Sequence, residues 1–488
     1  MRNGLTINRI IKSYWQFFIL AILILLYTFA FSYFSILRHN AFASGFDLSN
    51  MDQTIWNTLH GRIFALTGTK GTISRFSIHA DIILILLTPL YLIWDNVRTL
   101  LIFQSLSLAL GAIPVYLLTF KLLKQKGLAL LFVCIYFLNP GMQWVNIYDF
   151  HGVALAIPLV LSTFYFAYIK KWRLYLIFAF LSLLTKEEIP LIIALLGLLQ
   201  IFIWKERKIG TITFVFATLW FSLATFVIIP YFSPSHSHWA LLYYRNAGSE
   251  FNVEHLTLIP QQIIVNYFIN PDDLKYYQLL LKPFAFLPVL GIPWIILVFP
   301  DLVINLLSSH AQMRSIDLQY DSGIVPGLLI STIFTISYLK FILSKIKIKA
   351  KFKLGIIYIV TFLLLLVTIR ANYGYGPLPF SKSCWCVMYQ VSSQDIAFDK
   401  ALQTIPQNAS VSSSPEVRPH LTHRLNAFTV PDATSSADFI ALIDQNRIVG
   451  DYSPKTFEIS LIKSLNNNKV YEQIYHQGHF YLYQRLVK

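Results

Sequence analysis

Two carboxylates, Asp47 and Asp52, lie close together in residues 46–61, FDLSNMDQTIWNTLHG. Apolar residues recur there at spacings of three and four, which predicts a helix over 48–59 with Asp52 at the edge of its apolar face, beside Trp56. We expect this helix to lie flat on a membrane, with Trp56 at head-group level and Asp52 near the lipid boundary. A carboxylate held at that depth is costly unless it is paired or used. For Asp47 the plainer alternative is that its whole role is to cap the N-terminus of this helix.

Further titratable residues border the apolar runs of the chain. They are His79 with Asp81, Asp149 with His151, and the run Lys186-Glu187-Glu188. An aromatic and basic group that includes Arg245 lies near the start of the polar loop after residue 232. Such a group forms either an interfacial belt or a lip that binds phosphate.

These residue types suit the transfer of a sugar from a lipid carrier whose leaving group is a phosphate. The reaction needs a base that deprotonates the acceptor hydroxyl, and Asp52 is the first candidate, with Asp47 second. Positive side chains can neutralise the phosphate in the same site. The residues expected to line this site or bind the substrate are His79, His151, Lys186, Glu187 and Arg245.

Each of these assignments has a plainer alternative. His79 and Asp81 could belong to a site for a divalent ion such as Mg²⁺ or Mn²⁺, but two residues at this spacing are weak evidence, and His79 could be structural. Lys186 and Glu187 could form an ion pair that only orients helices. Glu188 fits a charge at the start of a helix.

Composition identifies a polytopic membrane protein. Of 488 residues, 56% are hydrophobic and 13% charged, and the mean hydropathy is +0.57. The net charge of +15 does not indicate nucleic acid, because membrane proteins gather Lys and Arg in cytoplasmic loops. The chain has three cysteines, of which Cys384 and Cys386 stand too close in sequence for an easy disulfide.

The basic clusters predict an orientation in the inner (plasma) membrane. Clusters at the N-terminus and near residues 121–126, 170–173, 205–208 and 340–353 hold 18 of the 39 basic residues. All can be cytoplasmic, with the N-terminus, if 82–94 does not cross fully and the proline-broken run 281–308 returns to its starting side. The chain then has nine full spans, or about eleven if the broken run makes two crossings. All the polar clusters named above fall on the extracytoplasmic face.

From Arg370 onward the composition becomes that of a soluble protein. Alternating segments and two helix-like pieces, at about 394–404 and 455–466, predict a small extracytoplasmic α/β domain. We therefore divide the chain into a membrane domain, 1–370, with its first extracytoplasmic loop at 37–97, and a domain at 371–488. Phosphate-binding loops, dinucleotide fingerprints and zinc-protease motifs are not found in the sequence.

An ordered set of motifs resembles a bacterial membrane-protein family known as domain of unknown function 2079. The motifs are FDLSNMDQTIWNTLHG, FSIHADIILILLTPLY, NIYDFHGVALAIPLVL, LLTKEEIPLIIALLGL, FPDLVINLLSS and IPQNASVSSSPEVRPHLTHR. The resemblance covers about residues 46–444. The stretch SIDLQYDSGIVP departs from it, with Gln319 where the resemblance leads us to expect a histidine.

This family is similar in outline to GT-C glycosyltransferases, polytopic enzymes that use polyprenyl-phosphate sugars. That similarity implies an α-helical GT-C-like membrane fold and an essential acid in the first extracytoplasmic loop, which by position is Asp47 or Asp52. The partners it implies are membrane lipid and a polyprenyl-phosphate-linked sugar. We therefore expect a membrane glycosyltransferase with an extracytoplasmic acceptor.

Two other functions remain open at this point. In a transporter or flippase for a lipid or polar solute, Lys186, Glu187 and His151 would be coupling charges within the membrane. In a scaffold without catalysis, the C-terminal domain would bind a partner in the cell envelope.

Overall fold

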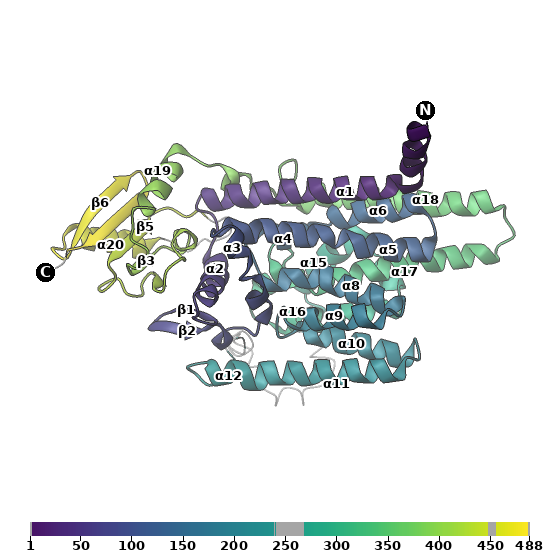
Figure 1. The fold of residues 1–488 in the computed structure, drawn as a ribbon, viewed down its shortest axis with the longest axis horizontal. Coiled ribbons are helices and arrows are strands. Elements are labelled where there is room, and N and C mark those ends of the chain that lie inside the picture. The colour runs from purple at the N-terminus through teal and green to yellow at the C-terminus, as the bar shows by residue number, and fades with distance from the viewer. Residues whose placement is uncertain (1, 239, 241–267, 448–454, 487–488) are drawn as a thin grey trace.

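The computed structural model describes residues 2–238, 240, 268–447 and 455–486 of the chain. Its long helices run side by side along the longest axis, with a small sheet domain at one end and the turn between α17 and α18 at the other (Figure 1). Among the described residues, five helices are long and apolar enough to cross a membrane. They are residues Tyr14–Asn40 of α1 (Arg2–Asn40), α4 and α5 together (Arg98–Leu110, Ala112–Leu123), α11 to α12 (Arg207–Leu223, Ile229–Phe232), α17 (Ile324–Lys345) and α18 (Ala350–Tyr375).

Shorter apolar helices account for most of the other runs that the sequence predicts as spans. A sixth span exists if α6 (Lys126–Phe137) and α7 (Pro140–Ile147), which bend by 51° at their junction, are taken as one. The helices α8 (Ala156–Tyr168), α9 (Trp172–Leu183) and α10 (Ile189–Phe202) have 12 to 14 residues. At 1.5 Å per residue they reach about 20 Å, less than a bilayer core of about 30 Å. Within the part of the chain that the structure describes, length and composition thus identify five or six candidate spans, against the nine that we expect from sequence.

The two segments expected not to form simple spans are both broken. Residues Ile82–Leu87 form a 3-10 helix, followed by the single-turn α3 (Leu90–Ile93). Between α15 (Pro271–Leu281) and α16 (Phe299–Leu307) lie the short 3-10 helices Lys282–Phe284, Leu287–Leu290 and Trp294–Val298. Each short helix after α15 has a proline within or just before its first turn, and proline cannot donate to a helical ladder.

The helix that carries Asp47 and Asp52 is α2 (Phe46–Leu59). It is followed by the antiparallel hairpin of β1 (Ala65–Gly68) and β2 (Gly71–Ser74). The expectation that α2 lies flat on lipid is wrong, because every residue from Leu48 to Asn57 is buried. Its apolar face packs on Ile83, Leu84 and Leu87, and its polar side chains meet the C-terminal domain.

The C-terminal domain is built on a five-stranded mixed sheet in the order β4-β3-β5-β7-β6. Strand β3 (Val411–Ser413) pairs in parallel with β4 (Ala427–Thr429) and β5 (Phe439–Ile443), and β7 (Phe480–Arg485) pairs antiparallel with β5 and β6 (Tyr471–Gln477). The helices α19 (Ser393–Leu402) and α20 (Thr456–Asn466) agree with the two predicted helical pieces.

A disulfide joins Cys384 and Cys386, contrary to the expectation from sequence. The two Cα atoms are 5.1 Å apart, within the usual range for disulfides, because the backbone bends at Trp385 (φ −80°, ψ 38°), just before the 3-10 helix Cys386–Tyr389.

Candidate functional site

A cavity of about 800 Å³ lies at the end of the helical bundle nearest to α2. Its walls come from the start of α2, the segment after β2, the junction of α9 and α10, α16, and the stretch between α16 and α17. Four of the predicted site residues line it: Asp47, His79, Lys186 and Glu187. Residues more than 100 positions apart in sequence therefore face one cavity.

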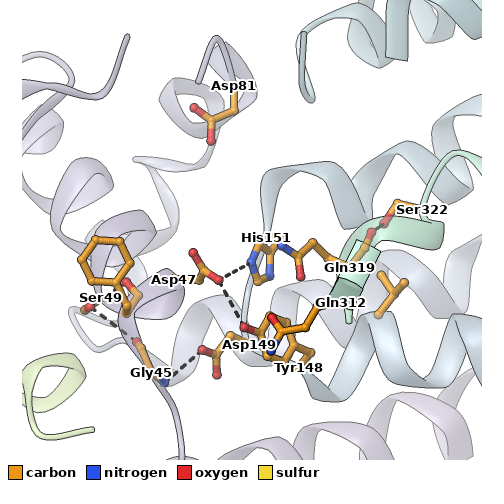
Figure 2. Close-up of polar contacts among 12 residues, drawn as sticks. Gly45, Asp47, Ser49, Asp81, Tyr148, Asp149, His151, Gln312, Gln319 and Ser322 are labelled. Atoms are coloured by element: carbon orange, nitrogen blue, oxygen red, sulfur yellow. Dashed lines mark hydrogen bonds and ion pairs between the residues drawn. The ribbon is translucent and has the colours of Figure 1, made fainter. Parts of the chain in front are cut away.

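Asp47 lies in the first turn of α2 and is open to the cavity, with 36% of its side chain exposed. Its Oδ2 atom is 3.3 Å from His151 Nε2 and 3.5 Å from the hydroxyl of Tyr148 (Figure 2). Burial alone would raise the pKa of Asp47, but the contact with His151 and the charges of Arg75 and His79 outweigh it and lower the pKa to about 2. Asp47 is therefore ionised at neutral pH.

Asp149 fixes the position from which α2 starts. It accepts a hydrogen bond from Gly45 N at 3.0 Å through one oxygen (Figure 2). Its other oxygen forms a 2.5 Å ion pair with Arg38. The Gln104 side chain donates to the carbonyl of Asp149 at 2.7 Å and accepts from His151 N at 2.9 Å. The loop after α7 thus positions Asp47 and His151 together.

The Glu187 carboxylate contacts the segment after β2 and one further histidine. Its carboxylate is 2.7 Å from His79 Nδ1, 3.6 Å from His238 Nε2 and accepts from Ala80 N at 3.2 Å. Lys186 pairs at 2.6 Å with Glu188, and the Lys186–Glu187 pair considered from the sequence is replaced by this contact. Residues 186–188 connect α9 to α10, so both pairs form at a junction between two short helices.

Asp81 forms an ion pair with Arg75. Both of its oxygens accept from Arg75 Nε at 3.1 Å, and one also accepts from Arg75 Nη2 at 2.7 Å. Within the described residues there is no group of three or more His, Cys, Asp or Glu side chains placed to hold a metal ion. The divalent-ion site that the sequence suggests at His79 and Asp81 stays a prediction.

Asp52 belongs to a different site, between α2 and the C-terminal domain. It is fully buried, is absent from the cavity wall, and accepts from the hydroxyls of Tyr91 and Thr422. His423 lies between two carboxylates, with Nε2 3.2 Å from Asp52 and Nδ1 3.1 Å from Asp95. Burial lowers the pKa of His423, but the two carboxylates reverse this and raise it to about 10.

Several cavity residues were not expected from the sequence. They include Arg75, Asp301, Asn305, Gln312 and Tyr320. His238, which also lines the cavity, belongs to the aromatic and basic group noted after residue 232. The one clear signal was Asp301, because a carboxylate inside the apolar run FPDLVINLL is rare unless it has a role. Gln319, noted for its departure from the motif, also lines the cavity. Arg245, which we expect to bind substrate, lies outside the described residues.

Comparison with solved structures shows the same membrane fold. The crystal structure of ArnT from Cupriavidus metallidurans bound to undecaprenyl phosphate matches with a TM-score of 0.54 and 12% identity, over 95% of this chain and 97% of that one. The apo form of that protein matches with a TM-score of 0.48, and the mycobacterial arabinofuranosyltransferase AftD with 0.45 and 10% identity, over 40% of its length. At 12% identity the likeness to ArnT bound to undecaprenyl phosphate shows the fold alone, and it confirms the GT-C-like architecture with a C-terminal domain.

No curated protein matches the chain. The family model described as "Predicted membrane protein (DUF2079)" matches residues 38–482, which is most of the chain. The multi-pass membrane architecture expected from composition agrees with this match. The chain therefore belongs to the DUF2079 family of membrane proteins, as its motifs indicated.

Proposed function

We propose that this protein is an integral membrane glycosyltransferase, which moves a sugar from a polyprenyl-phosphate donor to an acceptor outside the cytoplasm. The observation that carries the proposal is the cavity, in which an ionised Asp47 shares one space with Arg75 and Lys186. A base and a phosphate-binding group are the two elements that such a transfer requires. A protein of similar fold, ArnT, holds undecaprenyl phosphate in its crystal structure, which supports the class of donor.

In this mechanism Asp47 is the base. It accepts the proton of the acceptor hydroxyl while the hydroxyl oxygen bonds to the anomeric carbon of the sugar. The bond from that carbon to the phosphate oxygen breaks, and its electron pair leaves with the phosphate. A carboxylate whose pKa is about 2 is a weak base, so it takes up the proton only as the new bond forms and the hydroxyl becomes acidic.

The leaving phosphate gains negative charge, and the positive side chains of the cavity wall can stabilise it. Arg75 and Lys186 are the candidates, each already paired with one carboxylate, Asp81 or Glu188. Guanidinium and ammonium groups can bind a phosphate while keeping such a pair, because each has several N–H donors. We place the cavity on the extracytoplasmic face, following the basic loops.

The test measures consumption of the donor, because the acceptor is unidentified. The protein in nanodiscs is incubated with undecaprenyl-phosphate-linked sugars and a cell-envelope extract, and release of undecaprenyl phosphate is followed by mass spectrometry. Asp47→Asn should slow the release by about 100-fold or more, the usual effect of losing a general base. The exposed Asp272→Asn serves as the matched control and should keep the wild-type rate.

Two outcomes would contradict the proposal. Asp47→Asn could retain wild-type release, which would remove Asp47 from the reaction. Alternatively, the wild-type protein could release nothing while carrying the intact lipid across vesicle membranes, which would favour the transporter.

A further inference from the structure

The C-terminal domain contacts the cavity wall through one arginine. Arg418 begins the 3-10 helix Arg418–His420, directly before the PHLTHR motif, and is 1% exposed. Its Nε donates to the carbonyl of Ala427, in its own domain, at 2.8 Å. The other nitrogens all donate to the first loop of the membrane domain: to Asn50 Oδ1 at 2.8 Å, Gln53 Oε1 at 3.2 Å and the carbonyl of Thr67 at 3.3 Å.

Two of the residues that Arg418 touches also line the cavity. Asn50 accepts its hydrogen bond, and the guanidinium carbon lies 5.4 Å from the ring centre of Phe46. Phe46 and Asn50 are four residues apart and so lie on one face of α2, on either side of Asp47 in sequence. A shift of the guanidinium would therefore move the turn of helix that presents Asp47.

The surroundings of Arg418 favour a fixed geometry. None of the described carboxylates lies within ion-pair distance, so its charge is stabilised by neutral oxygens and by the Phe46 ring. A buried charge of this kind is costly unless its donors are satisfied, and the planar guanidinium satisfies them only in one orientation. The contact is thus specific in direction as well as in position.

We infer that Arg418 is a positioning residue for Asp47, and that through it the C-terminal domain forms part of the catalytic machinery rather than a separate module. Arg418 acts through Asn50 and the first turns of α2 and does not touch the cavity itself. The inference rests on the proposed function for the role of Asp47, but the position of α2 can be measured without any reaction.

The experiment compares Arg418→Gln with a matched control, Arg424→Gln. Arg424 is also buried and lies in the same segment, but its side chain donates only to carbonyls of Leu421, Pro406 and Ala409 within the C-terminal domain. Hydrogen exchange followed by mass spectrometry reports α2 and the C-terminal sheet separately in the full-length protein. Donor consumption and the Kd for undecaprenyl phosphate are measured on the same samples.

Arg418→Gln should speed amide exchange in residues 46–57 by about tenfold or more, because it removes hydrogen bonds that hold α2. It should also slow donor consumption, leave the Kd for undecaprenyl phosphate within about twofold, and keep the protection of β5 and β7. Arg424→Gln should leave exchange in α2 unchanged. Asn50→Ala should reproduce the effect on α2, and the double variant should add little, because both single changes break the same contact.

The inference is overturned if α2 exchanges at the wild-type rate in Arg418→Gln, or if Arg424→Gln loosens α2 equally. It is also overturned if α2 loosens while donor consumption stays at the wild-type rate. Failure of the proposed function looks different: the wild-type protein then neither binds undecaprenyl phosphate nor consumes the donor, whatever happens to α2.

Discussion

Replacing Asp52 by asparagine should weaken the contact between the two domains without removing the proposed base. The Asp52 carboxylate is fully buried and faces His423, Tyr91 and Thr422. Asparagine has nearly the same shape but no charge, so His423 would keep only the half-exposed Asp95 as a negative partner. The substitution therefore tests the effect of the Asp52 charge on stability while the volume of the side chain stays nearly constant.

The magnitude follows from the pKa of His423, which rises from 6.5 to about 10. At 1.36 kcal/mol for each pH unit this corresponds to roughly 5 kcal/mol, shared between Asp52 and Asp95. The Asp95 side chain is 49% exposed and screened by water, so most of the effect belongs to Asp52. We expect Asp52→Asn to cost about 3 kcal/mol at pH 6.5, at the lower end for breaking a buried pair.

The sign of the pH dependence is also fixed. Because the pKa of His423 is raised in the folded protein, its stabilisation is complete below about pH 6.5 and is lost as the pH rises towards 10. Thermal unfolding between pH 6 and pH 9.5, followed by circular dichroism, should show wild-type stability falling over this range and a flatter, lower curve for Asp52→Asn. Asp95→Asn, the more exposed partner, should lose only about 1 kcal/mol.

The opposite result would be an Asp52→Asn variant that unfolds like the wild type at pH 6.5 but no longer consumes the donor. That result would return Asp52 to the role of base that the sequence suggested first.

Two further predictions concern the cavity and its support. Arg38→Met should lower the free energy of unfolding by about 3 kcal/mol or more in chemical denaturation, because it leaves Asp149 buried without its cation, and a loss under 0.5 kcal/mol would contradict this. Lys186→Met should weaken binding of undecaprenyl phosphate by about tenfold at low salt, because it removes a positive charge from the cavity wall. Native mass spectrometry measures the affinity. Lys170→Met, which removes the exposed ion pair with Glu206, should leave the affinity unchanged.

The grouping of Asp47, His79, Lys186 and Glu187 around one cavity was accessible from the sequence. Each lies beside an apolar run, and the basic loops assign those ends of the runs to one face of the membrane. Apolar runs and loop charges depend on local composition, so they can be recognised in the sequence without knowing how the helices pack. The composition after residue 370, which is typical of a soluble protein, likewise predicts the C-terminal α/β domain.

The different surroundings of Asp47, in the cavity wall, and Asp52, against the C-terminal domain, were not accessible from the sequence. The spacing of Leu48, Met51 and Ile55 identifies the apolar face of α2 correctly, since these residues pack in the core of the first loop. It says nothing about what covers the polar face, and there the partner is a segment more than 360 residues away. Periodicity distinguishes apolar from polar faces, but it cannot distinguish water, lipid and a polar protein surface.

The same applies to the partners of the charged residues. Arg75 lies only six residues before Asp81, yet the pairing depends on the tight 3-10 turn Arg75–Ser77 that follows β2. Lys186 has two adjacent glutamates, and only the backbone at the α9–α10 junction decides that Glu188 is its partner. Local sequence offers such alternatives, and the fold selects among them.

The long separation between α2 and its partners bears on how the protein is made. Gln53 donates to the carbonyl of Arg424, 371 residues later, so at about 5 to 20 residues per second the ribosome needs roughly 20 to 75 seconds between the two. During that interval the polar face of α2 has emerged but its docking partner does not yet exist. A chain that stops before residue 418 should therefore contain every described residue that lines the cavity, while the turns of α2 that present Asp47 still lack their contacts with the C-terminal domain.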